Sequence, residues 1–210
     1  MTDLSPLPAP DSDTRRIFLA VELSPDVHGA VAELSSRLQK GAQFTPARLV
    51  WAPESNLHVI LYFLGPVSRA KTDALAREVQ NYAPTCAPFT LDLRGVGIFP
   101  KQANVPPKVL WIGVHKPPAG LLTLRDACAT AIRRAGLEVP DQDFLPHITL
   151  ARFKSTKGLT PLMTQLRNHE FAKLGKSPVA QVTLMESITG GGQARYEAIA
   201  RFPLADPKEG

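Results

Sequence analysis

Cysteine is scarce in this 210-residue chain, which has only Cys86 and Cys128. The two lie far apart, and neither belongs to a C-x-x-C pair or has a histidine at the spacing of metal ligands. The sequence therefore predicts neither a disulfide framework nor a zinc site. Isolated cysteines of this kind are typical of reduced thiols, so we expect a cytoplasmic protein.

Long apolar runs are missing as well. No stretch approaches the roughly 20 apolar residues of a membrane span, so we expect no membrane partner. The first residues lack the basic start and the apolar core of a secretory signal, which is why we expect no secretion.

Several catalytic signatures are also absent. The sequence has no G-x-G-x-x-G or P-loop pattern, which counts against dinucleotide or nucleoside triphosphate binding. It has no G-x-S-x-G elbow, so a serine nucleophile lacks support. It has no H-E-x-x-H pair, and neither His58 nor His147 has a second His, Cys, Asp or Glu at close ligand spacing, so we expect no metal centre.

The composition is that of an ordinary globular protein with a basic balance. Hydrophobic residues make up 44% of the chain and charged residues 20%, and a chain of this length can bury a core as one domain or as two closely packed lobes. The formal net charge of +5 favours an anionic partner. Charge alone does not select nucleic acid, because many basic enzymes bind no polymer.

Residue patterns divide the chain into short strands and helices. Residues 1–14 are rich in Pro, Asp, Ser and Thr without periodicity, which predicts a disordered leader. The predicted helices cover 25–40, 68–82, 118–135 and 159–172. The predicted strands cover 15–22, 48–51, 57–64, 88–99, 108–114, 144–153, 178–188 and 194–204. Many strands are neighbours along the chain, which favours an α+β fold with antiparallel sheets over a parallel doubly wound sheet.

Two histidines stand in matching surroundings, Leu-His58-Val-Ile60 and Pro-His147-Ile-Thr149. Residues i and i+2 of a strand point to the same face, so His147 shares a face with the Thr149 hydroxyl. His58 shares its face with Ile60, where a hydroxyl would complete the match. His28, His115 and His169 have no such context, and we interpret them as structural or surface residues.

A single histidine on a strand is most often a partly buried structural residue, but two in matching patterns indicate chemistry. An imidazole has an unperturbed pKa of about 6.5, so one ring can accept a proton while the other donates one near neutral pH. Such a pair suits an in-line displacement at phosphorus. There, one ring takes a proton from the attacking oxygen and the other protonates the leaving oxygen.

Arg152 is the candidate for holding phosphate oxygens beside His147, since a guanidinium stabilises charge on such oxygens. It stands five residues after His147, and strict alternation would place it on the opposite face. It can reach a shared site only through a bulge, a twist or the end of the strand.

The wider pattern resembles the 2H phosphoesterase superfamily, in particular the bacterial and archaeal RNA 2′,3′-cyclic phosphodiesterases, historically called 2′-5′ RNA ligases. That family carries two H-x-[T/S]-x motifs on strands. The matching segments are 16–20, 50–58, 62–65, 109–114, 144–152, and 184–187 followed by Tyr196.

The resemblance implies a single bilobal domain over residues 15–204, with a tail at 205–210, two pseudo-symmetric lobes of antiparallel sheet, helices packed outside and a central cleft. It implies hydrolysis of RNA 2′,3′-cyclic phosphate ends or cyclic nucleotides without metal or other cofactor, in a protein expected to be a monomer. If the matching positions have the roles of the family's motif residues, His58 would be the general acid and His147 the base that activates water. Thr149 and Arg152 would hold the phosphate, and Phe18 is the candidate for stacking on the terminal base.

Ile60 departs from the family pattern, in which a Thr or Ser donates to a phosphate oxygen. Losing a hydrogen bond to a charged group costs about 1.5–3 kcal/mol, or about one to two decades in rate if the bond tightens in the transition state. Two alternatives remain open. One is a non-catalytic protein that binds RNA ends or nucleotides, and the other is RNA ligation by the reverse reaction.

Overall fold

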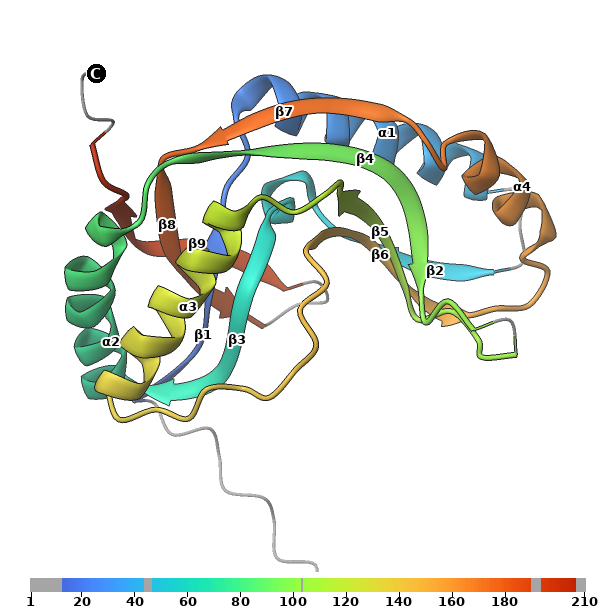
Figure 1. Cartoon of the computed structure of the whole chain (residues 1–210). Helices are drawn as coiled ribbons and strands as arrows, with labels where there is room; N and C mark the ends of the chain where they lie inside the picture. The colour runs from blue at the N-terminus through green and yellow to red at the C-terminus, as the bar shows by residue number, and fades with distance from the viewer. Residues whose placement is uncertain (1–12, 44–46, 103, 190–193, 207–210) are drawn as a thin grey trace, which may run out of the picture.

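The computed structural model describes residues 13–43, 47–102, 104–189 and 194–206. Within these ranges the chain forms four α-helices and one nine-stranded sheet in which every pairing is antiparallel (Figure 1). The strands are β1 Thr14–Val21, β2 Arg48–Trp51, β3 Val59–Ser68, β4 Phe89–Phe99, β5 Val109–Val114, β6 His147–Ser155, β7 Lys173–Val179, β8 Gln181–Ile188 and β9 Arg195–Pro203. Their order is β7-β4-β5-β6-β3-β1-β8-β9, with β2 pairing on β6.

The sheet consists of two halves that meet at a single residue pair. Val59 of β3 pairs with Ile148 of β6, whereas other neighbouring strands share longer ladders. We call β7-β4-β5-β6, together with β2, the His147 half-sheet, and β3-β1-β8-β9 the His58 half-sheet. The predicted α+β fold with two lobes of antiparallel sheet is confirmed.

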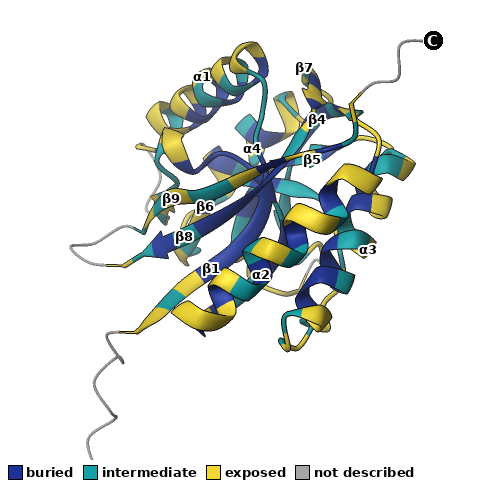
Figure 2. Cartoon of the chain, turned by 90° about the vertical axis from the view of Figure 1, so that its left-hand side faces the viewer, coloured by how far each residue is buried: buried dark blue, intermediate teal, exposed yellow. Residues whose placement is uncertain are grey.

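The helices pack outside the sheet, and two of them pack on the half-sheet opposite to the one whose strand they follow. Helix α1 (Pro25–Ala42) follows β1 of the His58 half-sheet but packs against β7, beside α4 (Thr160–Asn168). Helix α3 (Ala119–Arg134) follows β5 of the His147 half-sheet but packs on α2 (Arg69–Tyr82) and β3. Figure 2 shows α2 and α3 with buried faces toward the sheet and exposed faces outward. Because each lobe is completed by a helix that follows a strand of the other, the two halves are bound into one unit.

One core joins these layers through apolar side chains at helical and strand spacing. Val27, Val31, Leu34 and Leu38 give α1 the buried stripe that its sequence predicts. The inward residues of the strands pack against it, including Leu91, Leu93, Ile112, Ile148 and Leu150. The opposite face of the sheet carries a smaller cluster around Phe18, Ala20 and Met185, together with the polar side chains discussed below.

Several element boundaries differ from the predictions, two of them in a way that changes the reading of a segment. Strand β1 begins at Thr14, so this residue belongs to a strand and not to the predicted leader. The predicted helix 159–172 ends at Asn168, and the chain then forms β7, a strand of the sequence Lys-Leu-Gly-Lys-Ser-Pro-Val. This segment has too little apolar alternation to indicate a strand, and pairing with β4 makes it one. Residues 1–12, 190–193 and 207–210 lie outside the described residues, and they include most of the predicted leader and part of the predicted tail.

No helix in the described part of the chain is long and apolar enough to cross a membrane.

Candidate active site

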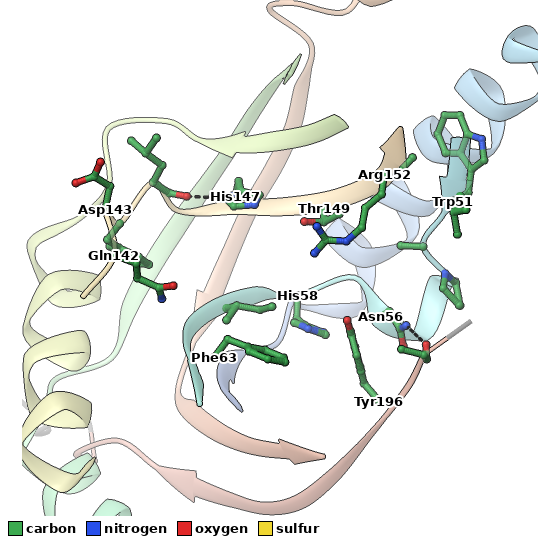
Figure 3. Close-up of a pocket in the computed structure, with 18 residues that line it drawn as sticks. Trp51, Asn56, His58, Phe63, Gln142, Asp143, His147, Thr149, Arg152 and Tyr196 are labelled. Atoms are coloured by element: carbon green, nitrogen blue, oxygen red, sulfur yellow. Dashed lines mark hydrogen bonds between the residues drawn. The ribbon is translucent and has the colours of Figure 1, made fainter. Parts of the chain in front are cut away.

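A cavity of about 390 Å³ opens on the concave face of the sheet, where the two half-sheets meet (Figure 3). Both predicted histidines line it, His58 from the start of β3 and His147 from the start of β6. Thr149, Arg152 and Ile60 line it as well. Four of these five belong to the predicted site, and the fifth is the position where the hydroxyl is missing, so the fold brings together residues from distant parts of the sequence.

His58 is held between aromatic rings at the back of the cavity. Its side chain is buried, and the residue is only 5% exposed. The Phe18 ring stacks on it with centroids 5.2 Å apart, and the Tyr196 ring is tilted against it at 5.3 Å. Phe18 itself has no exposed surface. It therefore offers no face to a base, and the expectation that it stacks on substrate is corrected: its ring supports His58.

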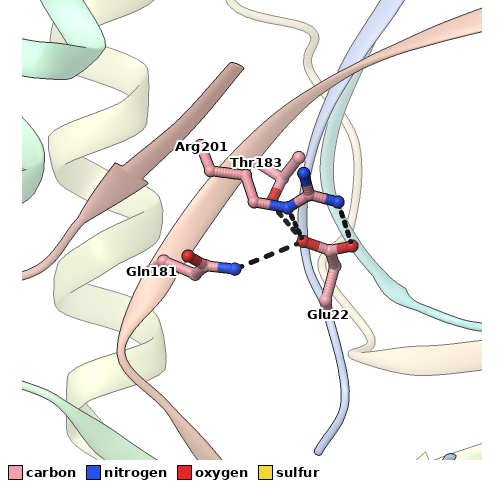
Figure 4. A network of polar contacts seen from close by, with 4 residues as sticks. All are labelled: Glu22, Gln181, Thr183 and Arg201. Atoms are coloured by element: carbon pink, nitrogen blue, oxygen red, sulfur yellow. Dashed lines mark hydrogen bonds and ion pairs between the residues drawn. The ribbon is translucent and has the colours of Figure 1, made fainter. Parts of the chain in front are cut away.

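Burial lowers the pKa of His58 to about 4, because the charged imidazolium loses its hydration there. The negative charge of Glu22 acts in the opposite direction and raises that pKa. Glu22 follows β1, which runs beside β3 with Val21 paired to Val59. Its carboxylate accepts hydrogen bonds from Arg201 at 2.8 and 3.1 Å, from Thr183 at 2.8 Å and from Gln181 at 3.4 Å (Figure 4). The Arg201 hydrogen bond above all lowers the pKa of Glu22, so this carboxylate is ionised near neutral pH.

His147 is oriented by the backbone just before it. Its Nδ1 lies 2.6 Å from the carbonyl oxygen of Leu145. A carbonyl only accepts, so Nδ1 carries the hydrogen and Nε2 of the neutral ring is left with a lone pair. The Phe99 ring meets the imidazole edge-on at 5.0 Å. Burial lowers the pKa of His147, the Leu145 hydrogen bond opposes this, and the Arg152 charge adds to the lowering.

Arg152 reaches the cavity through a β-bulge. Strand β5 pairs Trp111 with Thr149 and Leu110 with Ala151, so Leu150 is skipped in the register. The extra residue changes the alternation of side chains beyond it, and Arg152 lines the same cavity as Thr149. Figure 3 shows its guanidinium turned toward the cavity above His58. The bulge is one of the three means by which the sequence allowed Arg152 to reach the site.

Asn56 and Tyr196 also line the cavity, although neither belongs to the two histidine motifs. The Asn56 side-chain amide donates to the Ala194 carbonyl at 2.7 Å. This bond ties the residue two positions before His58 to the one two positions before Tyr196. Figure 3 shows the Tyr196 hydroxyl directed into the cavity beside His58. The pairing of β9 with β8 brings Tyr196 here, so the sequence pattern that includes this residue could not by itself place it beside His58.

The arrangement places two imidazoles, two hydroxyls and one guanidinium around one cavity. A lone pair on His147 Nε2 can accept a proton, and Thr149, Arg152 and Tyr196 can donate to an anion. Among the described residues, no group of three or more His, Cys, Asp or Glu side chains is placed to hold a metal ion. The site is therefore suited to proton transfer around a bound anion.

Comparisons with known proteins agree on one family. The model of the 2′-5′ RNA ligase superfamily matches residues 25–191. A relative from Aquifex aeolicus, named RNA 2′,3′-cyclic phosphodiesterase, is 30% identical over 158 residues, which cover 73% of this chain and 81% of the relative. A protein of the same name from Escherichia coli is 28% identical over 193 residues, covering 92% of this chain and 98% of the relative.

Solved structures give the same result. E. coli LigT complexed with 3′-AMP matches with a TM-score of 0.72 and 26% identity, over 92% of this chain and 99% of that one. E. coli LigT complexed with phosphate matches with a TM-score of 0.68 and 26% identity, over 93% of this chain and the whole of the other.

Proposed function

Because the chain belongs to the 2′-5′ RNA ligase superfamily, we propose that it hydrolyses RNA 2′,3′-cyclic phosphate ends to 2′-phosphomonoesters. The reaction uses His58 and His147 as acid and base and needs no metal. The observation that carries this proposal is that the two histidines, one from each half-sheet, line one cavity together with Thr149 and Arg152. The names of the Aquifex and E. coli relatives support the choice of substrate.

In this mechanism the cyclic phosphate lies between the two imidazoles. His147 Nε2 takes a proton from a water molecule, whose oxygen attacks phosphorus. The bond from phosphorus to O3′ breaks, and His58 gives its proton to O3′, which leaves as a hydroxyl. The 2′ ester bond stays intact, so the product is a 2′-phosphomonoester. The hydrogen bond from His147 Nδ1 to the Leu145 carbonyl fixes the tautomer that this base requires.

His58 must be protonated to act as the acid, yet burial lowers its pKa to about 4 in the unliganded protein. The cyclic phosphate carries a negative charge, and an opposite charge within a few ångströms favours the protonated ring. The substrate therefore raises the pKa of its own acid. Glu22 assists, since its charge also raises the pKa of His58.

The phosphate oxygens are held unevenly by the two half-sheets. Thr149 and Arg152 of the His147 half-sheet donate to them, and a guanidinium matches the geometry of phosphate oxygens. On the other side Ile60 offers no donor. We assign this role to Tyr196, whose hydroxyl is directed into the cavity next to His58 (Figure 3). Its ring is fixed by Phe18, at a centroid distance of 4.9 Å, and by His58.

The test is turnover of a 2′,3′-cyclic nucleotide and of a cyclic-phosphate RNA in the presence of EDTA. We expect hydrolysis to a 2′-phosphate that EDTA leaves unchanged and that His58→Ala and His147→Ala each reduce by at least about 100-fold. His28→Ala, at a partly exposed residue outside the cavity, is the matched control. Turnover that survives both cavity variants would refute the mechanism.

Two further outcomes separate the alternatives. Tight binding of 2′-phosphorylated RNA ends without turnover would identify a binding protein, in which the Ile60 change reflects lost catalysis. Joining of a cyclic phosphate to a 5′-hydroxyl would identify the reverse reaction, which the same two histidines serve by microscopic reversibility. Hydrolysis is expected to dominate in water unless the second RNA end is held in place.

A further inference from the structure

A second hollow lies on the concave face of the His147 half-sheet, away from the cavity described above. Its volume is about 410 Å³. It is lined by Thr90, Asp92, Arg94, His115, Lys116 and Lys176, which come from β4, β7 and the turn after β5. None of these residues has a part in the proposed reaction, so the hollow needs a separate explanation.

The hollow is continuous with the active-site face. Gly113 of β5 pairs with His147 on one side and with Arg94 on the other. Residues paired across antiparallel strands have side chains on the same face, so His147, Gly113 and Arg94 form a row on the concave face. The row spans two strand spacings, or roughly 10 Å. Gly113 has no side chain, and the Trp111 ring packs over it, so an aromatic surface lies between the cavity and the hollow.

The hollow is positively charged. Asp92 accepts two hydrogen bonds from Arg94, at 2.9 and 2.6 Å, and these two charges compensate each other. Lys116 and Lys176 are both exposed, and in the described part of the chain neither forms an ion pair with a carboxylate. Closer to His147, the Lys101 ammonium lies over the Trp111 ring, 5.4 Å from its centroid. Uncompensated cations in a groove are what a row of phosphates requires.

Lys116 is also held in an unfavourable backbone conformation. Its φ of 44° lies in the left-handed region, and among the described residues it is the one non-glycine residue with a positive φ. Glycine adopts that conformation without a steric penalty, whereas a lysine does not. A strained residue that persists at the edge of a charged hollow indicates that its side chain has a use there.

We propose that this hollow binds the RNA strand on the 5′ side of the cyclic phosphate, with Lys116 and Lys176 contacting backbone phosphates. The inference rests on the proposed function, since it takes the cyclic phosphate end of the strand to be bound in the cavity. An RNA strand bound in this way also explains why the Lys116 and Lys176 charges lie on the same face of the sheet as His147. An acidic peptide would match the charge of the hollow but would have no reason to begin at a phosphoryl-transfer site. The substrate is accordingly an RNA several nucleotides long, and a cyclic mononucleotide uses only the cavity.

The test compares a cyclic mononucleotide with an RNA of about eight nucleotides that carries the same 2′,3′-cyclic end. The variants are Lys116→Gly and Lys176→Gln, alone and combined, with Lys40→Gln on α1 as a matched loss of charge on the opposite side of the sheet. We expect both hollow variants to raise KM for the RNA and to leave the mononucleotide kinetics unchanged. In the double variant, the plot of log kcat/KM for the RNA against log salt should become shallower by about 1.4, or about 0.7 per lysine.

Lys116→Gly separates binding from structure. Glycine relieves the backbone strain, so the melting temperature should stay level or rise while the KM for the RNA rises. If the double variant has the same KM for the RNA and the same salt dependence as the unaltered protein, while both substrates are still hydrolysed, the inference fails and the proposed function stands. If neither substrate is hydrolysed by the unaltered protein, the proposed function fails and this RNA path falls with it.

Discussion

Val59 and Ile148 form the pair at which the two half-sheets join, and each stands directly after one of the two site histidines. Continuing this antiparallel register by one residue on either side sets His58 opposite Thr149 and Ile60 opposite His147. Each histidine therefore lies opposite the third residue of the other motif, which is Thr149 for His58 and Ile60 for His147. A phosphate bound at the junction meets the Thr149 hydroxyl on one strand and only the apolar Ile60 side chain on the other.

Ile60→Thr is expected to raise kcat/KM for a 2′,3′-cyclic nucleotide by about 10- to 100-fold. The new hydroxyl would donate to a phosphate oxygen, and a hydrogen bond to a charged group is worth about 1.5–3 kcal/mol. Ile60→Val is the control, because valine has nearly the shape of threonine without its hydroxyl. Equal rates for the two variants would show that this position does not limit catalysis.

Tyr196→Phe tests whether the tyrosine hydroxyl replaces the one that Ile60 lacks. The ring and its packing on Phe18 and His58 are kept, so the melting temperature should change little. We expect kcat/KM to fall by about tenfold or more. In the Ile60→Thr background the loss should be smaller, since a second donor is then present. A double-mutant cycle measures the difference, and an identical loss in both backgrounds would remove Tyr196 from the phosphate site.

The sequence predicted the parts of this site that lie within single strands. His58, His147 and Thr149 follow from short alternating patterns, and Arg152 was recognised as needing a bulge such as the one at Leu150. Sequence patterns could not show which residues long-range pairing adds to the site. Tyr196 and Asn56 join the site through contacts between distant segments, and β7 is a strand because β4 lies beside it. Phe18 lies next to the site, as predicted, but it is fully buried and has no exposed ring face for a base.

Arg152→Lys is expected to lower kcat/KM by about one to two decades despite keeping the positive charge. A lysine ammonium cannot form the two parallel hydrogen bonds that a guanidinium makes to phosphate oxygens. Arg195→Lys is the matched control, since Arg195 lies on β9 with an exposed ion pair to Glu197. Comparable losses in the two variants would mean that arginine geometry at the cavity is not important for the reaction.

Protein stability is expected to fall as the pH drops below about 6.5. Burial lowers the pKa of His58 to about 4 in the folded state, while the unfolded chain has a pKa of about 6.5. Between these values the unfolded chain binds the proton more readily, so the free energy of unfolding decreases with falling pH. His58 alone accounts for a loss of about 2 kcal/mol by pH 5. His147, whose pKa burial also lowers, adds to it.

Urea unfolding at pH 7 and pH 5 measures this dependence. In His58→Phe an aromatic ring remains between Phe18 and Tyr196 but cannot titrate, so the loss between the two pH values should shrink by about 2 kcal/mol. A loss that is the same in the unaltered protein and in His58→Phe would mean that His58 titrates normally in the folded state.

Glu22→Gln is expected to reduce activity at neutral pH and to restore it on acidification. The Glu22 carboxylate raises the pKa of His58, so its loss lowers that pKa further. His58 acts only when protonated, and the alkaline limb of the kcat profile should therefore move to lower pH. At a pH below this limb the variant and the unaltered protein should have similar rates.

Thr183→Val distinguishes the charge of Glu22 from the structure around it. This variant removes one hydrogen bond to the carboxylate, while Arg201 continues to hold Glu22 ionised. It should leave the pH profile unshifted if the charge alone acts on His58, even where it lowers the melting temperature. A Glu22→Gln profile that is reduced in height but unmoved along the pH axis would assign Glu22 a structural role only.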